Sequence, residues 1–549
     1  MAVQRTGTVP YSVAGFGTAL THDLANGTAA AHAFFPSKNW EQVAREIDRH
    51  SYSREQLHTI LHNRATEFGA TPEVLANIEH LRKSGTYVVA TGQQAGLLGG
   101  PLYSLHKALT TIKLARTFEA ESRGAHHFVP IFWVASDDHD LGEIDHADLL
   151  DKSGALHRVR APLDAQSAGR SACDVVLDKP ALETLRANLR GAIEDDAIVQ
   201  RFIDTYSGRS LSGAFAKLLT DWLGALGLVV VEAHDMRPLS GNVLLKEFAQ
   251  YETTAKLIEG EAASLRVHGY TPGFNGKARP GPHFFITTER AKIRARLEPS
   301  GAGTYHEHSP AFEAREENAR SYSAEELAHI VREHPERFSA SAALRPVVQQ
   351  TIFPVAAVVL GPGEIDYWAQ LKKVHDHFGA VFPLAIPRAS LTLVDGSSAK
   401  ALRKLNIEPN SSELFGDEEK LKARILAGSE ISRKIEERTR SIMDELDKLA
   451  ADVQAVDKGV NPRFEKTRER FAHELQRIAE KTATSLGQRG GADQARLQQI
   501  STFIRPKNQP QERVLNCGQF ISRYPTLPNE LLDLIDLNVR EHLVVTIDG

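Results

Sequence analysis

The sequence predicts an α/β fold: a doubly wound parallel-sheet core with two insertions, followed by an antiparallel helical coiled coil. Short apolar runs alternate with stretches of helical periodicity, as in a parallel sheet whose strands are joined by helices. Two glycine-rich turns each follow an apolar run and precede a helical stretch. From about residue 411, apolar residues recur every three or four positions, which is the spacing of a coiled-coil seam.

Composition excludes several classes of protein. The 549 residues are 42% hydrophobic and 25% charged, which is typical of soluble globular proteins with more than one domain. A net charge of −5 argues against a nucleic-acid partner. We expect no membrane span, since no run of about 18 apolar residues occurs, and the N-terminus lacks the apolar core of a signal peptide. Two cysteines, Cys173 and Cys517, exclude a disulfide framework, and we expect a cytoplasmic enzyme in which both thiols are buried.

The first 85 residues predict a helical segment that packs on the sheet. Trp40, Val43 and Ile47 have helical spacing, and a second amphipathic helix is expected at 73–81. The core is expected to follow over residues 86–410.

The first core strand is predicted at 86–90, and a glycine-rich turn follows it. Glycine lets backbone amides approach a ligand, and the helix that begins near Pro101 would attract anions at its N-terminus. A turn needed for geometry alone is the alternative, although many hydrogen-bonding side chains surround these glycines. The spacing matches neither the dinucleotide fingerprint nor the phosphate loop. Seven residues of this stretch are candidates for binding substrate or nucleotide: Gly92, Gln93, Gln94, Gly96, Gly100, Tyr103 and Lys107.

The second strand, 127–135, leads into a carboxylate-rich run. Ligands of open parallel sheets bind beyond the carboxyl ends of the strands, so Ser136 is a further binding candidate. Asp138, His139 and Asp140 are the predicted catalytic residues, as a general base or as a site for a substrate ammonium. A magnesium or zinc site is an open alternative, as is helix capping by an aspartate. We assign no metal ligands.

The second glycine turn follows a strand predicted at 351–360. Gly361 and Gly363 lead into a helix that places Glu364 and Tyr367 on nearly one face, and these four residues are further binding candidates. We expect this turn, the first glycine turn and the aspartates from position 137 onward to converge on one cavity.

Two insertions separate the core strands. The first is expected near 150–200 and the second, partly β, near 255–340; a third core strand is predicted between them at 228–233, and a fifth at 381–386. The second insertion is locally basic, which indicates a solvated charged surface or an anion site. Its basic residues are Lys277, Arg279, Arg290, Lys292, Arg294 and Arg296.

The C-terminal part predicts a long antiparallel hairpin of helices over 411–510. A break at 459–462 separates its two helices. We expect the hairpin to act as a dimer interface or as an arm, and residues 511–549 to pack back on the core.

Five segments together resemble the bacillithiol synthase family. In chain order they are ATGQQAGLLGGPLYSLHK, PIFWVASDDHD, VLGPGEIDYWAQLKKV, PRASLTLVD and PQERVLN. The resemblance covers nearly the whole chain. It implies a Rossmann-like core akin to class I aminoacyl-tRNA synthetases, two connecting insertions, and a coiled coil that forms a homodimer.

The resemblance also implies a reaction. Such an enzyme is a cysteine ligase that joins cysteine to the amine of glucosaminyl malate, with ATP as the simplest activating co-substrate and magnesium left open. The turn from Gly92 to Gly100 would then hold phosphates or the activated carboxylate, and Asp138, His139 or Asp140 would bind amino groups or act as the base. Two alternatives remain: a nucleotidyltransferase or other adenylating enzyme with a different acceptor, and a non-catalytic coiled-coil scaffold.

Overall fold

A five-stranded parallel sheet forms the centre of this computed structural model, which describes residues 2–274, 280–301, 303–315, 318–416, 428–456 and 461–548. The strands, in chain order, are β2 (Thr86–Gln93), β3 (His127–Val134), β6 (Val229–Glu232), β12 (Val355–Leu360) and β13 (Leu384–Pro387). Their spatial order is β13-β12-β2-β3-β6. From β2 the chain builds outward to β6, then returns to build β12 and β13 on the other side. The predicted doubly wound sheet is confirmed, and its topological switch point lies between β2 and β12.

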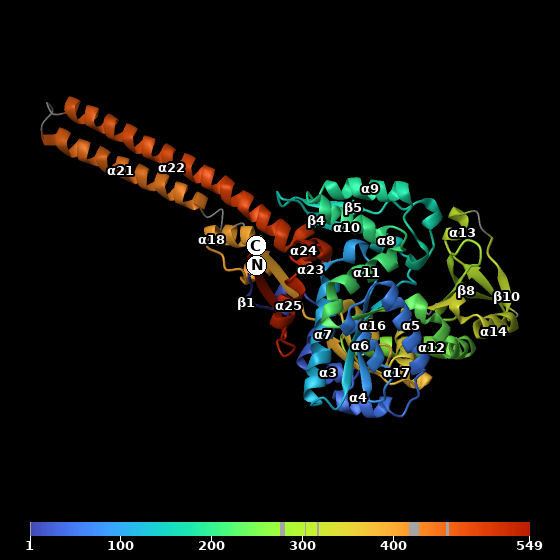
Figure 1. The fold of residues 1–549 in the computed structure, drawn as a ribbon. Coiled ribbons are helices and arrows are strands. Elements are labelled where there is room, and N and C mark those ends of the chain that lie inside the picture. Colours follow the sequence, from blue (N-terminus) through green and yellow to red (C-terminus); the bar gives the residue numbers. More distant parts are fainter. Residues whose placement is uncertain are drawn as a thin grey trace.

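Helices cover both faces of the sheet (Figure 1), because its strands are apolar on both faces. In β2, Val88 and Ala90 belong to one hydrophobic cluster, whereas Tyr87 and Val89 belong to another. The helices of the N-terminal segment and of the core are α1 (Tyr11–Ala14), α2 (Ala19–Asn26), α3 (Ala29–His32), α4 (Trp40–Ile47), α5 (Arg54–Glu67), α6 (Pro72–His80), α7 (Leu102–Glu121), α8 (Leu141–Ile144), α11 (Leu211–Leu223), α12 (Gly241–Val267), α15 (Arg345–Ile352), α16 (Pro362–Trp368) and α17 (Lys372–Phe378).

Two stretches differ from the expected secondary structure. The N-terminal segment is not helical throughout, because it begins with a strand, β1 (Ala2–Pro10), that pairs with the C-terminal strand. The strand expected at 351–360 is helical in its first residues, since α15 extends to Ile352. Phe353 is then extended, as the residue before Pro354 tends to be, and β12 begins only at Val355.

The two insertions pack against the core. Apolar side chains of the first belong to the same hydrophobic cluster as those of α7 and α11, and apolar side chains of the second belong to the cluster that contains Val88 and Ala90. The first contains the hairpin β4 (His146–Leu150) and β5 (Leu156–Arg160), with helices α9 (Lys179–Arg190) and α10 (Asp196–Tyr206). The second is an antiparallel sheet in the order β10-β9-β8-β7-β11, at the end of the molecule far from the coiled coil (Figure 1). Its elements are β7 (Phe284–Thr287), β8 (Arg294–Gly301), β9 (Thr304–His308), α13 (Ala311–Ala314), β10 (Ser321–Ser323), α14 (Ala324–Glu333) and β11 (Phe338–Ala340). Lys277 and Arg279 of the basic run lie outside the described residues.

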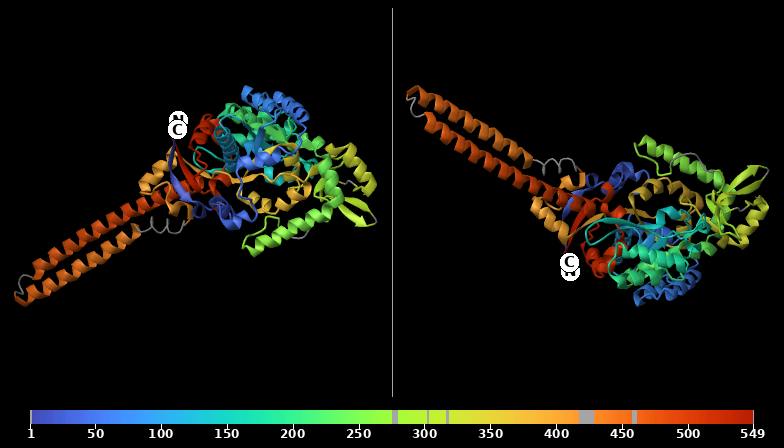
Figure 2. Two further views of the ribbon diagram at one scale, coloured as in Figure 1. Left: turned by 90° about the horizontal axis from the view of Figure 1, so that it is seen from below. Right: turned by 90° about the horizontal axis from the view of Figure 1, so that it is seen from above.

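The coiled coil projects from the body as an arm, which both views of Figure 2 show. The arm consists of α21 (Gly428–Val456) and α22 (Asn461–Ile504). Of the expected break at 459–462, residues 459 and 460 lie outside the described residues. Among the side chains of the arm that the structure describes, these large apolar ones are exposed to solvent: Ile442, Leu449, Val456, Phe471 and Ile478. None of the helices that the structure describes combines the length and apolar content needed to cross a bilayer.

The chain returns to the core after the arm. The returning elements are α23 (Gln511–Val514), α24 (Cys517–Arg523), α25 (Leu527–Leu534) and β15 (Glu541–Asp548). β15 pairs with β1 and with β14 (Leu391–Asp395) in a three-stranded sheet that lies at the base of the arm, beside α18 (Gly396–Leu405) and α19 (Ser412–Gly416). The two ends of the described chain therefore lie side by side.

A buried polar cluster joins this returning segment to the core. Glu512 on α23 forms a bidentate ion pair with Arg388, with Oε1–Nη2 and Oε2–Nη1 distances of 2.7 and 2.9 Å. Glu512 Oε2 also contacts His106 Nδ1 (3.0 Å) and accepts a hydrogen bond from Ser390 Oγ, which in turn contacts His542. All five side chains are buried. We call them the Glu512 cluster.

Candidate active site

Lys107 lies at the switch point between β2 and β12, and its side chain is only 3% exposed. Its Nζ donates to Gly92 O (2.7 Å) and Gln93 Oε1 (2.8 Å), and it pairs with Glu364 Oε2 at 2.5 Å. An ammonium has three donor hydrogens, so these contacts occupy all of them. Burial lowers the pKa of Lys107, although the charge of Glu364 opposes that effect. Glu364 also accepts from Gly361 N (2.8 Å), so the pair ties the two glycine turns together.

Gly92 has no side chain, and neighbouring atoms lie close to the position that a Cβ would take. A Cβ at this position would lie only 2.9 Å from Trp133 O, so glycine lets β3 approach closely here, and it would lie 3.8 Å from Arg345 Nη1, which is therefore a neighbour of the end of β2. Arg345 Nη2 donates to Tyr367 OH at 2.9 Å. The candidates of the two turns therefore meet around Lys107 and Arg345, with Gln93 Nε2 also donating to Tyr103 OH (3.3 Å). A Cβ on Gly363 would meet no atom within 4 Å, so close packing does not require glycine at this position.

A cavity of about 320 Å³ opens beyond the carboxyl ends of β3 and β6. One part of its lining is the run Asp137 to Asp140 together with Glu143, and residues of β7, β8 and β11 from the second insertion form another part. Three arginines also line it: Arg237, Arg294 and Arg345. Opposite charges thus share one solvent-accessible space at the place where parallel sheets bind ligands.

Gln94 joins the first glycine turn to this cavity. Its Nε2 donates to Asp138 Oδ2 at 2.8 Å and also to Glu143 Oε2. Burial alone would raise the pKa of Asp138, but the Gln94 hydrogen bond and the charge of Arg294 outweigh it and hold this pKa below its usual value. Asp138 is therefore a stable carboxylate at neutral pH and a weak base. The Asp140 side chain, which is exposed, makes no ion pair within the described residues.

Arg294 anchors the second insertion against His139. Its guanidinium donates to Ser339 Oγ (2.8 Å) and Ala340 O (3.0 Å), and its Nη1 lies 3.1 Å from His139 Nδ1. A guanidinium only donates, so this geometry assigns Nδ1 as the acceptor and the ring proton to Nε2. The Arg294 guanidinium also lies 3.8 Å from the centre of the Phe285 ring. Burial lowers the pKa of Arg294 to about 10, and the charge of Asp137 opposes that shift.

The carboxylate of Asp137 is paired with the guanidinium of Arg237. Arg237 Nη2 lies 2.5 Å from Asp137 Oδ1, and both side chains are mostly buried. The same guanidinium lies 4.0 Å from Cys173 Sγ. Burial raises the pKa of the Cys173 thiol well above its ordinary value, so this residue is protonated at neutral pH. Cys517 is buried, as expected, whereas Cys173 is only partly buried, so the expectation of two buried thiols holds for one of them.

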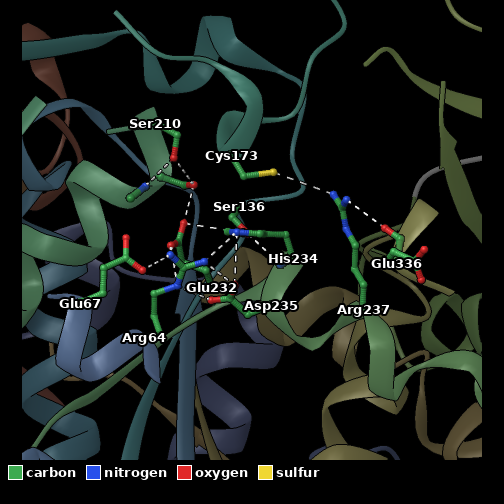
Figure 3. A network of polar contacts seen from close by, with 12 residues as sticks. Arg64, Glu67, Ser136, Cys173, Ser210, Glu232, His234, Asp235, Arg237 and Glu336 are labelled. Carbon is green, nitrogen blue, oxygen red and sulfur yellow. Dashed lines mark hydrogen bonds and ion pairs between the residues drawn. The ribbon is translucent and has the colours of Figure 1, made fainter. Parts of the chain in front are cut away.

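A possible metal-binding cluster lies next to this site, at the end of β6 (Figure 3). Ligand atoms of Glu232, His234 and Asp235 lie within 4.8 Å of one another. Arg64 already provides a cation there, since its Nη2 lies 2.5 Å from Asp235 Oδ1 and its Nε lies 3.8 Å from Glu232. A metal ion would have to displace this guanidinium. Ser136 belongs to this cluster through its Oγ, which lies 3.0 Å from His234 Nδ1.

Gly96 and Gly100 lie in a buried part of the first glycine turn. Gly100 O accepts from Cys517 N (2.8 Å), and Leu98 N donates to Tyr206 OH (2.8 Å). A Cβ on Gly96 would lie 2.7 Å from Gly100 Cα. Gly100 has a φ of 73°, which favours glycine, so the tight shape of the turn itself explains both glycines, and neither lines the cavity.

The predicted residues therefore do not all lie together: Gly96 and Gly100 belong to the buried turn, and Ser136 belongs to the cluster at the end of β6. Asp138, His139 and Asp140 line the cavity, and Gln94 contacts it through Asp138. The residues around Lys107 lie beside it and are connected to its wall by Arg345. The sequence analysis missed Arg237 and Arg345 as site residues, and it noted Arg294 only as part of a basic run. Arg345 follows no glycine turn or acidic run, so no local pattern marks it.

Two family models match nearly the whole chain. The N-terminal Rossmann-like domain of bacillithiol biosynthesis BshC matches residues 6–389, and the C-terminal coiled-coil domain of BshC matches residues 391–547. Curated relatives carry the name "Putative cysteine ligase BshC". They include proteins of Chloroherpeton thalassium (28% identity over 526 residues; 91% of this chain and 90% of the relative), Anoxybacillus flavithermus (26% over 520; 92% and 93%) and Bacillus cytotoxicus (26% over 497; 88% and 89%). The chain therefore belongs to the BshC family of bacillithiol biosynthesis.

Proposed function

We propose that this protein is a cysteine ligase of bacillithiol assembly, which joins the carboxyl group of cysteine to the amine of glucosaminyl malate. Family membership over nearly the full length supports the pathway, and the name of the relatives supports the reaction class. The observation that carries the proposal for this chain is the cavity beyond β3 and β6, where carboxylates and arginines share one solvent-accessible space. Both proposed substrates combine amino and carboxylate groups, which such a lining can bind.

ATP is the activating co-substrate in this proposal. A free carboxylate forms no amide until its oxygen is converted into a better leaving group, and ATP is the simplest source of that activation. The buried glycine turn does not fit phosphate binding as it stands, because Gly96 N, Leu98 N and Gly100 N all donate to protein oxygens. A magnesium requirement is part of the proposal, because magnesium commonly accompanies ATP on its phosphate oxygens.

The cavity residues have distinct roles in this reaction. Asp138 stays ionised because its pKa is lowered, which suits it to holding an ammonium or amine by charge-assisted hydrogen bonds. Gln94 orients that carboxylate. The amine nitrogen attacks the activated carbonyl carbon, the leaving group departs with its electron pair, and Asp140 accepts the proton that the nitrogen releases. His139 is a weaker candidate for the base, because Arg294 occupies its acceptor nitrogen.

A reconstitution assay tests this function. Purified protein is incubated with cysteine and glucosaminyl malate, with and without ATP and magnesium, and products are identified by mass spectrometry after thiol labelling. We expect a new thiol whose mass is that of the two substrates minus one water, formed only when ATP is present. Product without ATP would remove ATP from the proposal. An adenylated acceptor other than the sugar amine would favour a different adenylating enzyme, and no product with any nucleotide would favour the scaffold.

We also propose that the protein is a cytoplasmic homodimer that associates through its arm. The exposed apolar side chains of α21 and α22 provide a surface for a second copy of this chain. Cys173 and Cys517 are both free thiols, which fits a reducing compartment.

A further inference from the structure

The three arginines of the cavity wall differ in how far their donors are occupied. Arg237 is paired with Asp137, and Arg294 contacts three acceptors. Arg345 makes one side-chain hydrogen bond, to Tyr367 OH, and no ion pair with any carboxylate among the described residues. Its side chain is neither fully buried nor fully exposed. A guanidinium has five N–H donors, so most of the hydrogen-bonding capacity of Arg345 is left for another partner.

Two of the three cations around the switch point are paired with a carboxylate. Lys107 is paired with Glu364, and Arg388 is paired with Glu512. Arg345 is the third cation of this group, and its charge, like that of Arg388, disfavours the protonated form of Lys107. An anionic group bound next to Arg345 would give this guanidinium the kind of partner that Lys107 and Arg388 already have, whereas a neutral group would not.

Ser341 provides a second, independent indication of a ligand. It lines the same cavity, its side chain is 8% exposed, and its buried Oγ has no hydrogen-bond partner in the described structure. A buried hydroxyl without a partner is costly and rare, so it is expected to meet a ligand or an ordered water. The two residues are close in space, since Arg345 N donates to Ser341 O at 2.8 Å.

We propose that Arg345 and Ser341 form a carboxylate-binding subsite in the cavity that also holds the amine-binding Asp138. This inference rests on the proposed function for the identity of its ligands. Arg345 offers two parallel N–H groups, the geometry that matches the two oxygens of a carboxylate, and Ser341 adds a hydroxyl donor. The ligand is a small carboxylate, which can be the malate moiety of the acceptor or the α-carboxylate of cysteine.

Direct binding separates these two sources. Isothermal titration calorimetry measures the affinity of L-malate, L-cysteine and L-cysteinamide, which lacks the carboxylate, for the full-length protein and for the variants Arg345→Gln, Arg345→Lys and Ser341→Ala. We expect Arg345→Gln to weaken binding of at least one carboxylate probe by about tenfold or more, with Arg345→Lys intermediate and Ser341→Ala a few-fold weaker. L-cysteinamide should show no such loss. A loss for L-malate alone assigns the subsite to the acceptor, and a loss for L-cysteine alone assigns it to the amino acid.

Arg332→Gln is the matched control, because it removes the same charge from an exposed position on α14. It should bind all probes as the wild type does, and melting curves check that each variant is folded. Equal affinities of wild type and Arg345→Gln for both carboxylates would overturn the subsite, as would a wild type that binds neither. Because the readout is binding, a loss of affinity without any ligase product would leave the subsite standing while the proposed reaction failed.

Discussion

The Glu512 cluster and the cavity contain similar groups but differ in how completely those groups are paired. In the cluster, Glu512 meets Arg388 with two hydrogen bonds and is buried among His106, Ser390 and His542. In the cavity, Arg345 and Asp140 line open space and have no ion-pair partner in the described structure. Both regions lie near the carboxyl ends of core strands. Pairing therefore distinguishes polar groups that hold the fold together from groups that await a ligand.

The reason for the difference is the cost of burying charge. A buried carboxylate without a partner is strongly destabilising, so a closed cluster must be satisfied by the protein itself. Burial would raise the pKa of Glu512, but the charge of Arg388 and the hydrogen bond from His106 hold it far below its usual value. Groups that line open space keep part of their hydration, and they can remain unpaired until a substrate arrives.

The largest expected effect is that of breaking the Glu512 cluster. Glu512→Gln leaves the Arg388 guanidinium buried without a counter-charge, and we expect the free energy of unfolding to fall by about 3–5 kcal/mol. Thermal or denaturant unfolding measures this change. Glu55→Gln is the control, because it removes a carboxylate that pairs with Arg82 on the exposed surface and should leave the melting temperature nearly unchanged. Equal effects of the two substitutions would contradict the importance of burial.

Asp137 and Asp138 are adjacent in the sequence, and together they test the difference between a carboxylate that is paired within the fold and one that lines the cavity. Asp137→Asn removes the partner of the buried Arg237 and should lower the free energy of unfolding by about 3 kcal/mol. Asp138→Asn removes a carboxylate that lines the cavity and should cost much less stability while abolishing ligase turnover. Melting curves and product formation are measured on both variants. An Asp138→Asn protein that is less stable than Asp137→Asn would contradict the distinction.

Stability should also depend on pH through buried histidines. Burial lowers the pKa of both His375 and His542 to about 4, whereas an unfolded histidine titrates near 6.5. Between these values the unfolded chain binds the proton and the folded chain does not, so stability falls as pH falls from about 6.5 to 4, by up to about 1.4 kcal/mol per pH unit for each group. Denaturant unfolding at several pH values measures the slope. Replacing His542 with Gln should reduce that slope, and an unchanged slope would remove this histidine as a cause.

The smallest effect on folding is expected in the arm. Phe471 and Ile478 are exposed on α22, so changing both to Glu should leave the melting temperature of the body nearly unaltered. The same change should convert a dimer into a monomer, as measured by light scattering coupled to size-exclusion chromatography. Arg470→Gln, at an exposed polar position of the same helix, is the control and should stay dimeric. A wild-type monomer at micromolar concentration would contradict the proposed dimer.

The sequence predicted the core well because its strands carry a local signal. β2 and β3 are apolar on both faces and end in glycine or carboxylate residues, so their place and the site beyond them follow from a short window. Asp138 and Gln94 could be predicted as site residues for the same reason. Arg345 and Ser341 could not be predicted as site residues, because they line the cavity from a segment about 200 residues further along the chain. Nor could the burial of the turn that contains Gly96 and Gly100 be predicted, since Cys517, far along the chain, donates to Gly100 O.

The most direct test of whether this cavity is the active site is a comparison of the ligase reaction of wild type and Asp138→Asn. The two proteins are compared at equal concentration of folded protein. We predict that wild type converts cysteine and glucosaminyl malate into the amide when ATP is supplied, and that Asp138→Asn melts near the wild-type temperature but forms no detectable amide. Amide formation by Asp138→Asn at the wild-type rate would contradict the assignment of this cavity as the active site.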